Sequence, residues 1–162
     1  MSESDKTKEV IYLNDKIKDN VKKLKKKYNT SNPYDLIDYL EIERFDVPLG
    51  NRLGCYMYLQ RSRCIFLNSS IEDDHIHRIV AAHELGHAIQ HPKINCSFVK
   101  NYTLHSKNTF EIEANKFAAE LLLSDEILIE YQGKTVDQIA AYLNVIPELV
   151  KLKFLSFFIF YF

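Results

Sequence analysis

The sequence predicts an α+β fold in which a small three-stranded sheet packs on helices. Apolar residues recur at steps of three and four before residue 30 and again after residue 72, which is the spacing of amphipathic helices. Between them, residues 42–69 change to an alternating pattern rich in β-forming residues. A length of 162 residues corresponds to one domain. We expect that domain to span residues 1–162, with an amphipathic helix over 1–30, a core over 31–131 and a helical segment with an aromatic tail over 132–162.

The composition excludes several functional classes. Lysine and arginine number 21 against 22 aspartates and glutamates, so a formal charge of −1 argues against a nucleic-acid coat or a polybasic membrane binder. The longest apolar run, residues 154–162, is far shorter than the roughly 18 residues that a membrane span needs. The first residues lack the apolar core of a secretory signal, and the three cysteines form no C-x-x-C pair. We therefore expect a cytoplasmic protein with reduced thiols.

The first helix is expected over residues 10–28, where one apolar stripe repeats. The lysine run 22–27 is interpreted as its solvated face, with a basic docking surface for an acidic partner as the alternative. Nine lysines against five acidic residues give residues 1–30 a charge of +4, which leaves −5 for the remainder. Asn32 as cap and Pro33 as first residue predict a second helix that ends near Glu43.

Three short strands are expected next, in the segments RFDVPL, GCYMYLQ and RCIFLN. A two-residue turn at 61–62 would place Leu59 opposite Cys64 and Cys55 opposite Asn68. The two cysteines then do not face each other, which disfavours a disulfide. We expect the strand Cys64–Asn68 to form the edge of the sheet, where an extended peptide can add as a further strand.

Helical spacing returns at Glu72, with Ser69 or Ser70 as the cap and acidic residues at the positive end of the helix dipole. This helix should end at Gln90, before a proline. Residues 93–108 are expected to form a loop. Further helices are expected over residues 109–123, 125–131, 135–143 and 147–153.

The residues that carry chemistry form an H-E-x-x-H motif, His83-Glu84-Leu85-Gly86-His87, inside the expected helix. Residues four apart share one face of a helix, so both imidazoles can reach one metal ion. Glu84 lies about 100° round the helix from His83, where it can sit beside a metal-bound water without being a ligand. Imidazole nitrogens suit Zn²⁺. The apolar flanks indicate a buried helix, in which unpartnered polar groups would be costly.

A catalytic zinc site needs a third protein ligand. The extended motif H-E-x-x-H-x-x-G-x-x-H is excluded, because Gln90 and Lys93 occupy the places of its glycine and its third histidine. A carboxylate from the helix over 109–123 is the other common solution. Glu111 and Glu113 lie about 200° apart on that helix, so they cannot both face the metal.

Glu111 is favoured because it shares its face with small and apolar residues, which allow close packing, and with Asn115. The Asn115 side chain can hydrogen-bond a ligand histidine. Glu113 stays open as the alternative ligand. It shares its side with Lys116 and Glu120, a side that we expect to be closer to solvent.

The segments HELGHAIQHP and EIEANKFAAELLLS resemble those of the ImmA/IrrE family of bacterial metallopeptidases, over roughly residues 40–130. The resemblance implies a zincin-like core in which His83, His87 and Glu111 bind zinc and Glu84 is the catalytic base. Ser124 stands where the family often has a proline. The terminal sequence FLSFFIFYF is not explained by the resemblance.

The resemblance also implies a regulatory endopeptidase that cleaves a helix-turn-helix repressor. In such an enzyme Glu84 accepts a proton from the attacking water and passes it to the leaving amine. Tyr102 and His105, in the 93–108 loop, are candidates for a second oxyanion donor. The alternative function is a zinc-stabilised module that binds a repressor without cutting it.

The remaining motifs have simpler interpretations. His75 and His77 are expected at the surface, and His91 follows the helix without an assigned role. Residues 135–150 have the spacing of a DNA-binding helix-turn-helix, but the two lysines between residues 135 and 153 are offset by two acidic residues and offer too few phosphate contacts. We expect these residues to pack within the domain, with neither nucleic acid nor membrane as a direct partner.

Overall fold

A computed structural model describes the backbone of residues 3–95 and 109–158 and the side chains of 15–95, 109–127 and 129–155. Within these ranges the chain forms seven helices and one three-stranded sheet, which confirms the predicted α+β class. In chain order the elements are α1 (Glu3–Tyr28), α2 (Pro33–Tyr39), β1 (Glu43–Val47), β2 (Gly54–Leu59), β3 (Ser62–Asn68), α3 (Asp74–Gln90), α4 (Thr109–Leu122), α5 (Ile127–Glu130), α6 (Val136–Leu143) and α7 (Pro147–Phe158).

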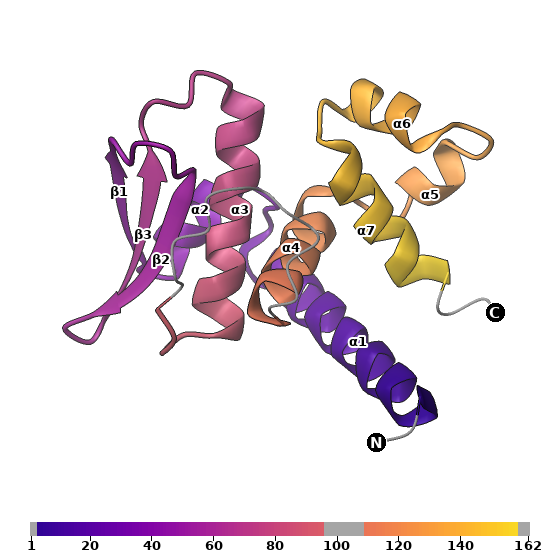
Figure 1. Cartoon of the computed structure of the whole chain (residues 1–162), viewed down its shortest axis with the longest axis horizontal. Coiled ribbons are helices and arrows are strands. Elements are labelled where there is room, and N and C mark those ends of the chain that lie inside the picture. The colour runs from indigo at the N-terminus through magenta and orange to yellow at the C-terminus, as the bar shows by residue number, and fades with distance from the viewer. Residues whose placement is uncertain (1–2, 96–108, 159–162) are drawn as a thin grey trace.

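The elements are arranged around α3 and α4 (Figure 1). The sheet lies on one side of α3, and α4 packs on the other. Helices α5, α6 and α7 form a group on the side of α4 away from the sheet, while α1 crosses α4 and continues beyond it. No helix among the described residues has the length and apolar character needed to cross a membrane.

The strand order is β1-β3-β2, with β1 parallel and β2 antiparallel to β3. The expectation that Cys64–Asn68 forms the edge is therefore wrong, because these residues belong to the central strand. The burial of the strands gives the physical reason. Most side chains of β3 are buried, whereas those of β1 are nearly all exposed, and the strand covered on both sides takes the centre.

The predicted hairpin register between β2 and β3 is also wrong, by two residues. The turn residues are Gln60 and Arg61, both with positive φ (46° and 72°), and Leu59 pairs with Ser62. Such a turn favours Asn or Gly, which are missing here, so the sequence carries no turn signal at the right place. A shift of two residues keeps each side chain on its face of the sheet. Cys55 and Cys64 are buried, and neither forms a disulfide within the described part of the chain.

Several helix boundaries differ from the prediction: α7, for example, ends at Phe158 rather than at residue 153, and the differences at α2 and α3 have a local cause. Helix α2 starts as expected, with Asn32 Oδ1 accepting from the Tyr34 N–H over 3.1 Å, but it ends at Tyr39 because Glu41 takes a left-handed φ of 53°. The cap of α3 is Asp73 rather than a serine. Its Oδ1 accepts from the N–H groups of His75 and Ile76. The N–H of Ser70 instead donates to Oδ1 of Asn68.

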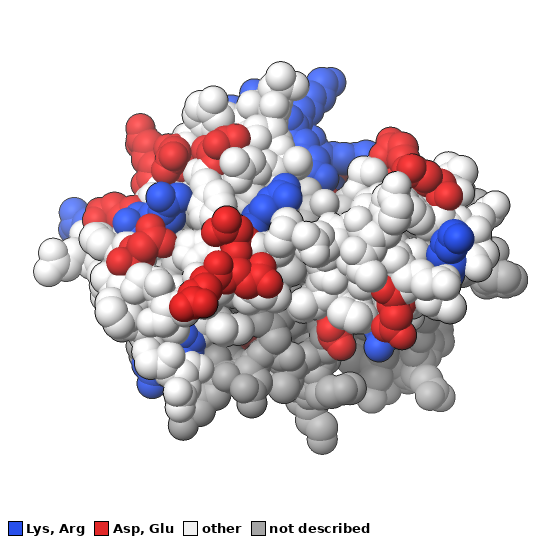
Figure 2. Space-filling view, turned by 90° about the horizontal axis from the view of Figure 1, so that it is seen from above, with Lys and Arg blue, Asp and Glu red and all other residues white. Residues whose placement is uncertain are grey.

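The C-terminal helices pack as expected, since Ile139 and Ala140 of α6 and Leu149 and Val150 of α7 are buried. The lysines of α1 are mostly exposed, but Lys25 donates to the carbonyl oxygen of Glu120 over 2.7 Å. A face seen from above carries both charge signs interspersed on a mainly uncharged surface (Figure 2). This mixture agrees with the near-zero net charge.

An ion cluster around the buried Lys153 ties α7 to α4 and α1. Lys153, only 3% exposed, donates through Nζ to Glu120 over 2.5 Å and to Asp125 over 2.6 Å. Lys18 of α1 lies 3.1 Å from the second oxygen of Asp125. The predicted aromatic tail beyond residue 158 lies outside the described residues.

Candidate metal centre

Close packing of α3 on α4 brings the H-E-x-x-H motif to the first turn of α4. The contact occurs at Gly86, where an added Cβ would lie 3.0 Å from both Cα and the carbonyl oxygen of Ala114 and 3.1 Å from Cβ of Phe117. Two of these neighbours are backbone atoms, so any side chain at this position would push the helices apart. Gly86 thus sets the separation at which a side chain from α4 can meet His83 and His87.

The structure brings together His83, His87 and Glu111, the group of described residues whose donor atoms could hold a metal ion. The two Nε2 atoms are 3.1 Å apart. Glu111 Oε2 lies 3.3 Å from Nε2 of His83, and its Oε1 lies 3.4 Å from Nε2 of His87. Tetrahedral zinc with ligands at about 2.0–2.1 Å requires ligand atoms about 3.3–3.4 Å apart. One ligand atom from each of the three residues lies within 4.8 Å of the other two, and imidazole nitrogen and carboxylate oxygen are ligands that zinc takes, so the donor set fits an ion of this kind.

The orientation of the His83 ring is set by a hydrogen bond at Nδ1, the ring nitrogen that does not face the cluster. Nδ1 lies 2.9 Å from Oδ1 of Asn115, which confirms the hydrogen bond predicted for Asn115. Because the amide oxygen can only accept, Nδ1 carries the proton in this arrangement, and the lone pair of Nε2 is directed into the cluster. Asn115 itself is buried on α4, one turn after Glu111.

The electrostatics of the cluster favour a charged carboxylate. Burial raises the pKa of Glu111, but the hydrogen bonds and charges of the two histidines outweigh burial and lower that pKa to about 2. Burial lowers the pKa of His87 and so favours its neutral form. Burial acts on His83 in the same direction, but Glu111, Glu84 and Asn115 outweigh it and raise its pKa.

Glu84 is buried on α3 beside the start of β2. A Cβ at Gly54 would lie 2.9 Å from Glu84 Oε1 and 2.7 Å from Cγ1 of Val80, so only glycine leaves room for this carboxylate. The sequence interpretation did not single out Gly54. A glycine inside a predicted strand often marks such a close approach, and that signal was available.

Glu113 is also buried, so the expectation of a solvent-like side of α4 is wrong for this residue and for Glu120. Both residues are buried because α1 packs on that side of α4, a tertiary contact that the local sequence pattern does not encode. Glu113 Oε2 lies 3.3 Å from Nε2 of His91 and does not join the cluster of His83. Burial raises its pKa.

His91 caps the end of α3 and is buried against the ring of Phe110, with ring centroids 4.6 Å apart. Burial and the nearby His87 lower its pKa to about 4. His77 is not the surface residue that was expected. It is largely buried, with Nδ1 2.6 Å from the hydroxyl of Tyr34 and Nε2 3.4 Å from Oδ1 of Asp46. Tyr102 and His105 lie outside the described residues.

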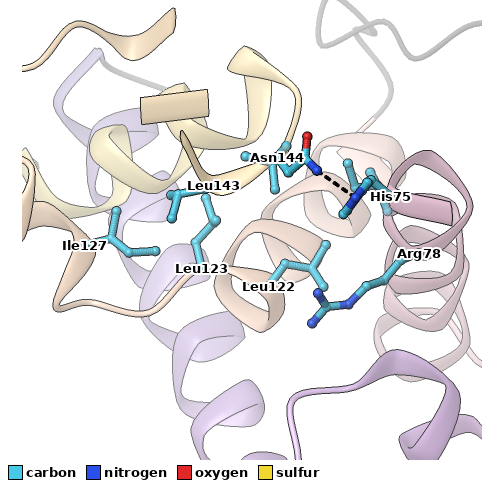
Figure 3. A pocket seen from close by; sticks show the side chains of 9 residues that line it. His75, Arg78, Leu122, Leu123, Ile127, Leu143 and Asn144 are labelled. Atoms are coloured by element: carbon cyan, nitrogen blue, oxygen red, sulfur yellow. Dashed lines mark hydrogen bonds between the residues drawn. The ribbon is translucent and has the colours of Figure 1, made fainter. Parts of the chain in front are cut away.

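A separate cavity of about 90 Å³ lies between the start of α3 and the C-terminal helices (Figure 3). His75 is exposed at its rim, as predicted, and its Nε2 accepts from Nδ2 of Asn144 over 2.6 Å. The aliphatic side chains of Leu122 and Leu143 line the opposite part of the cavity. None of the three clustered donor residues contributes to the lining.

An α+β domain that packs an H-E-x-x-H helix against a carboxylate from the following helix has the architecture of a metallopeptidase. The chain belongs to the family of the IrrE N-terminal-like domain, peptidase family M78, whose model matches residues 38–155. The family membership that the sequence motifs indicated is thereby confirmed.

Two relatives are similar over most of their length. "Uncharacterized immunity region protein 2" of Bacillus phage phi105 is 43% identical over 143 residues, which cover 86% of this chain and 90% of that protein. "Metallopeptidase ImmA" of Bacillus subtilis (strain 168) is 33% identical over 141 residues, which cover 83% of this chain and 82% of that protein. No solved structure matches the chain.

Proposed function

We propose that the chain is a zinc-dependent endopeptidase in which His83, His87 and Glu111 bind the metal and Glu84 is the catalytic base. The observation that carries the proposal is that the Nε2 atoms of the two histidines lie 3.1 Å apart and that each lies 3.3–3.4 Å from one oxygen of Glu111. Membership of a metallopeptidase family supports it.

In the proposed reaction, residues of the chain hold the metal, transfer the proton and keep the site in shape. When bound, zinc supplies the Lewis acid that activates a water and polarises the peptide carbonyl. Glu84 takes the proton of the attacking water at its carboxylate and passes it to the nitrogen of the leaving amine. Gly54 leaves the space in which the Glu84 carboxylate sits, and Asn115 keeps His83 in the orientation that ligation needs.

We propose that an extended substrate binds beside β2 rather than beside the strand first expected. β2 is an edge strand, and its first residue, Gly54, lies against Glu84. An added strand at this edge would run past the catalytic base. Strand β3 offers no such edge, because it pairs on both sides.

The substrate that we propose is a helix-turn-helix repressor in the cytoplasm. Support comes from the likeness to the ImmA/IrrE family and from a relative whose name assigns it to the immunity region of a phage. Cys55 and Cys64 form no disulfide within the described residues, which is consistent with a reducing compartment.

The function is tested by mixing the purified chain, zinc and the repressor encoded beside it, with and without a chelator. Fragments that vanish with chelator, and also with the Glu84→Gln protein, are the expected result. A repressor that stays intact but co-elutes with the zinc-loaded chain would overturn the peptidase and indicate the binding module instead.

A further inference from the structure

The outer edge of β2 is defined by the direction of its backbone groups. The N–H of Asn68 donates to the carbonyl of Leu53 over 2.9 Å, so the polar groups of Leu53 face β3. These directions alternate along an antiparallel strand. The N–H and C=O groups of Gly54, Tyr56 and Tyr58 are therefore directed away from β3, toward the edge that no further strand of the described residues occupies.

The two ends of this edge differ. Gly54 adjoins Glu84, the proposed catalytic base. Tyr58, four residues further on and about 13 Å away at the usual strand rise, is already engaged. Its N–H donates to Oδ1 of Asn95 over 2.7 Å. The side-chain oxygen of Asn95 thus takes the place that the backbone carbonyl of an added strand would occupy.

Asn95 is held there by the turn that follows α3. The hydroxyl of Tyr56 donates to the carbonyl of Pro92 over 2.6 Å, which fixes this turn against β2. Within the turn, the N–H of Ile94 donates to the carbonyl of His91 over 2.9 Å. Both contacts position Asn95 at the end of the edge that lies away from Gly54.

We propose that Asn95 is a positioning residue that closes the peptide-binding edge at Tyr58, so that an extended peptide pairs only with the part of the edge on the Gly54 side of Tyr58. This inference rests on the proposed peptidase function. It means that strand pairing on one side of the scissile bond stops after a few residues. Peptides extended further on that side gain no additional backbone hydrogen bond.

The contact itself is tested by amide hydrogen exchange of Tyr58 in the full metal-free chain. Asn95→Ala removes the acceptor, and we expect exchange about 2- to 10-fold faster, the factor of one modest hydrogen bond. Asn95→Asp keeps an acceptor oxygen and should exchange like the wild type. Lys93→Ala, in the same turn, is the matched control. Equal exchange in the wild type and Asn95→Ala would overturn the proposal.

The consequence for binding is tested with peptide hydroxamates, whose metal-binding group holds the peptide in one register. Two series of Val-Thr repeat peptides of increasing length are used, one with the hydroxamate at the C-terminal end and one with it at the N-terminal end. Binding of each peptide to the zinc-loaded chain is measured by calorimetry. In the series whose peptides extend toward Tyr58, affinity for the wild type should stop rising with peptide length. The affinity of Asn95→Ala should continue to rise, by about 2- to 10-fold for each added hydrogen bond. The other series should not distinguish the two proteins.

Two negative results are distinguishable. Binding of the hydroxamates with equal length profiles in the wild type and Asn95→Ala, in both series, would overturn the role of Asn95 alone. Failure of every hydroxamate, including acetohydroxamate, to bind the zinc-treated wild type would overturn the metal-dependent function and this inference with it.

Discussion

The imidazole of His83 and the side chain of Asn115 are joined by a hydrogen bond of 2.9 Å between Nδ1 and Oδ1, across the interface of α3 and α4. This bond fixes the ring from the side opposite the cluster. Asn115→Leu, which removes the acceptor at similar volume, should weaken zinc binding about 10- to 100-fold. Competition with a chromophoric chelator measures the change. Asn115→Asp, which keeps an acceptor oxygen, should stay close to the wild type, and equal losses in both variants would contradict this role.

Glu84→Gln should retain zinc and lose cleavage, because the amide keeps the shape of the side chain but cannot accept the proton of the attacking water. Zinc content is measured by atomic absorption and cleavage by fragment analysis of the repressor. Full cleavage by Glu84→Gln would remove Glu84 from the mechanism.

Glu111→Ala should lose zinc, whereas Glu113→Ala should keep it. The two carboxylates are both buried, but only Glu111 lies 3.3–3.4 Å from the two histidines of the cluster. Glu113 lies beside His91 instead. Metal analysis of the two dialysed proteins decides between them, and the reverse pattern would make Glu113 the ligand.

These local features were predictable from the sequence because they depend on helix geometry alone. The spacing of His83 and His87, and the shared face of Glu111 and Asn115, follow from 3.6 residues per turn. The burial of Glu113 could not be derived in this way, because it depends on how α1 packs on α4.

The sheet was less predictable for a similar reason. Three strands were expected near their observed positions, but their order depends on long-range packing that no local pattern encodes. The hairpin register depends on Gln60 and Arg61 taking positive φ, which neither residue signals. Consequently the local pattern points to β3 rather than β2 as the edge strand and assigns no role to Gly54.

Gly86 and Gly54 support the site in different ways, and replacing each with alanine should have different effects on stability, zinc affinity and cleavage. Gly86→Ala must move backbone atoms of Ala114 and should lower both stability, by about 1–3 kcal/mol, and zinc affinity. Gly54→Ala meets the side chains of Glu84 and Val80, so it should reduce cleavage more than zinc affinity. Urea unfolding, zinc competition and cleavage are measured on both. Unchanged zinc affinity in Gly86→Ala would show that helix separation does not control the cluster.

The ion cluster of the C-terminal helices predicts a dependence of stability on pH. Burial raises the pKa of Asp125, but its contacts with Lys153 and Lys18 outweigh burial and hold that pKa below its ordinary value. A lowered pKa in the folded state adds stability above the unfolded pKa, about 3.9, and that stability is lost as pH falls.

The wild type should therefore exceed Asp125→Asn in urea midpoint by a constant amount between about pH 5 and 8, and the difference should shrink below about pH 4. Titration of groups that do not interact with Asp125 affects both proteins alike and cancels in the difference. A gap that widens on acidification would have the wrong sign for a carboxylate stabilised by Lys153, and would exclude this ion pair as the source of the acid sensitivity.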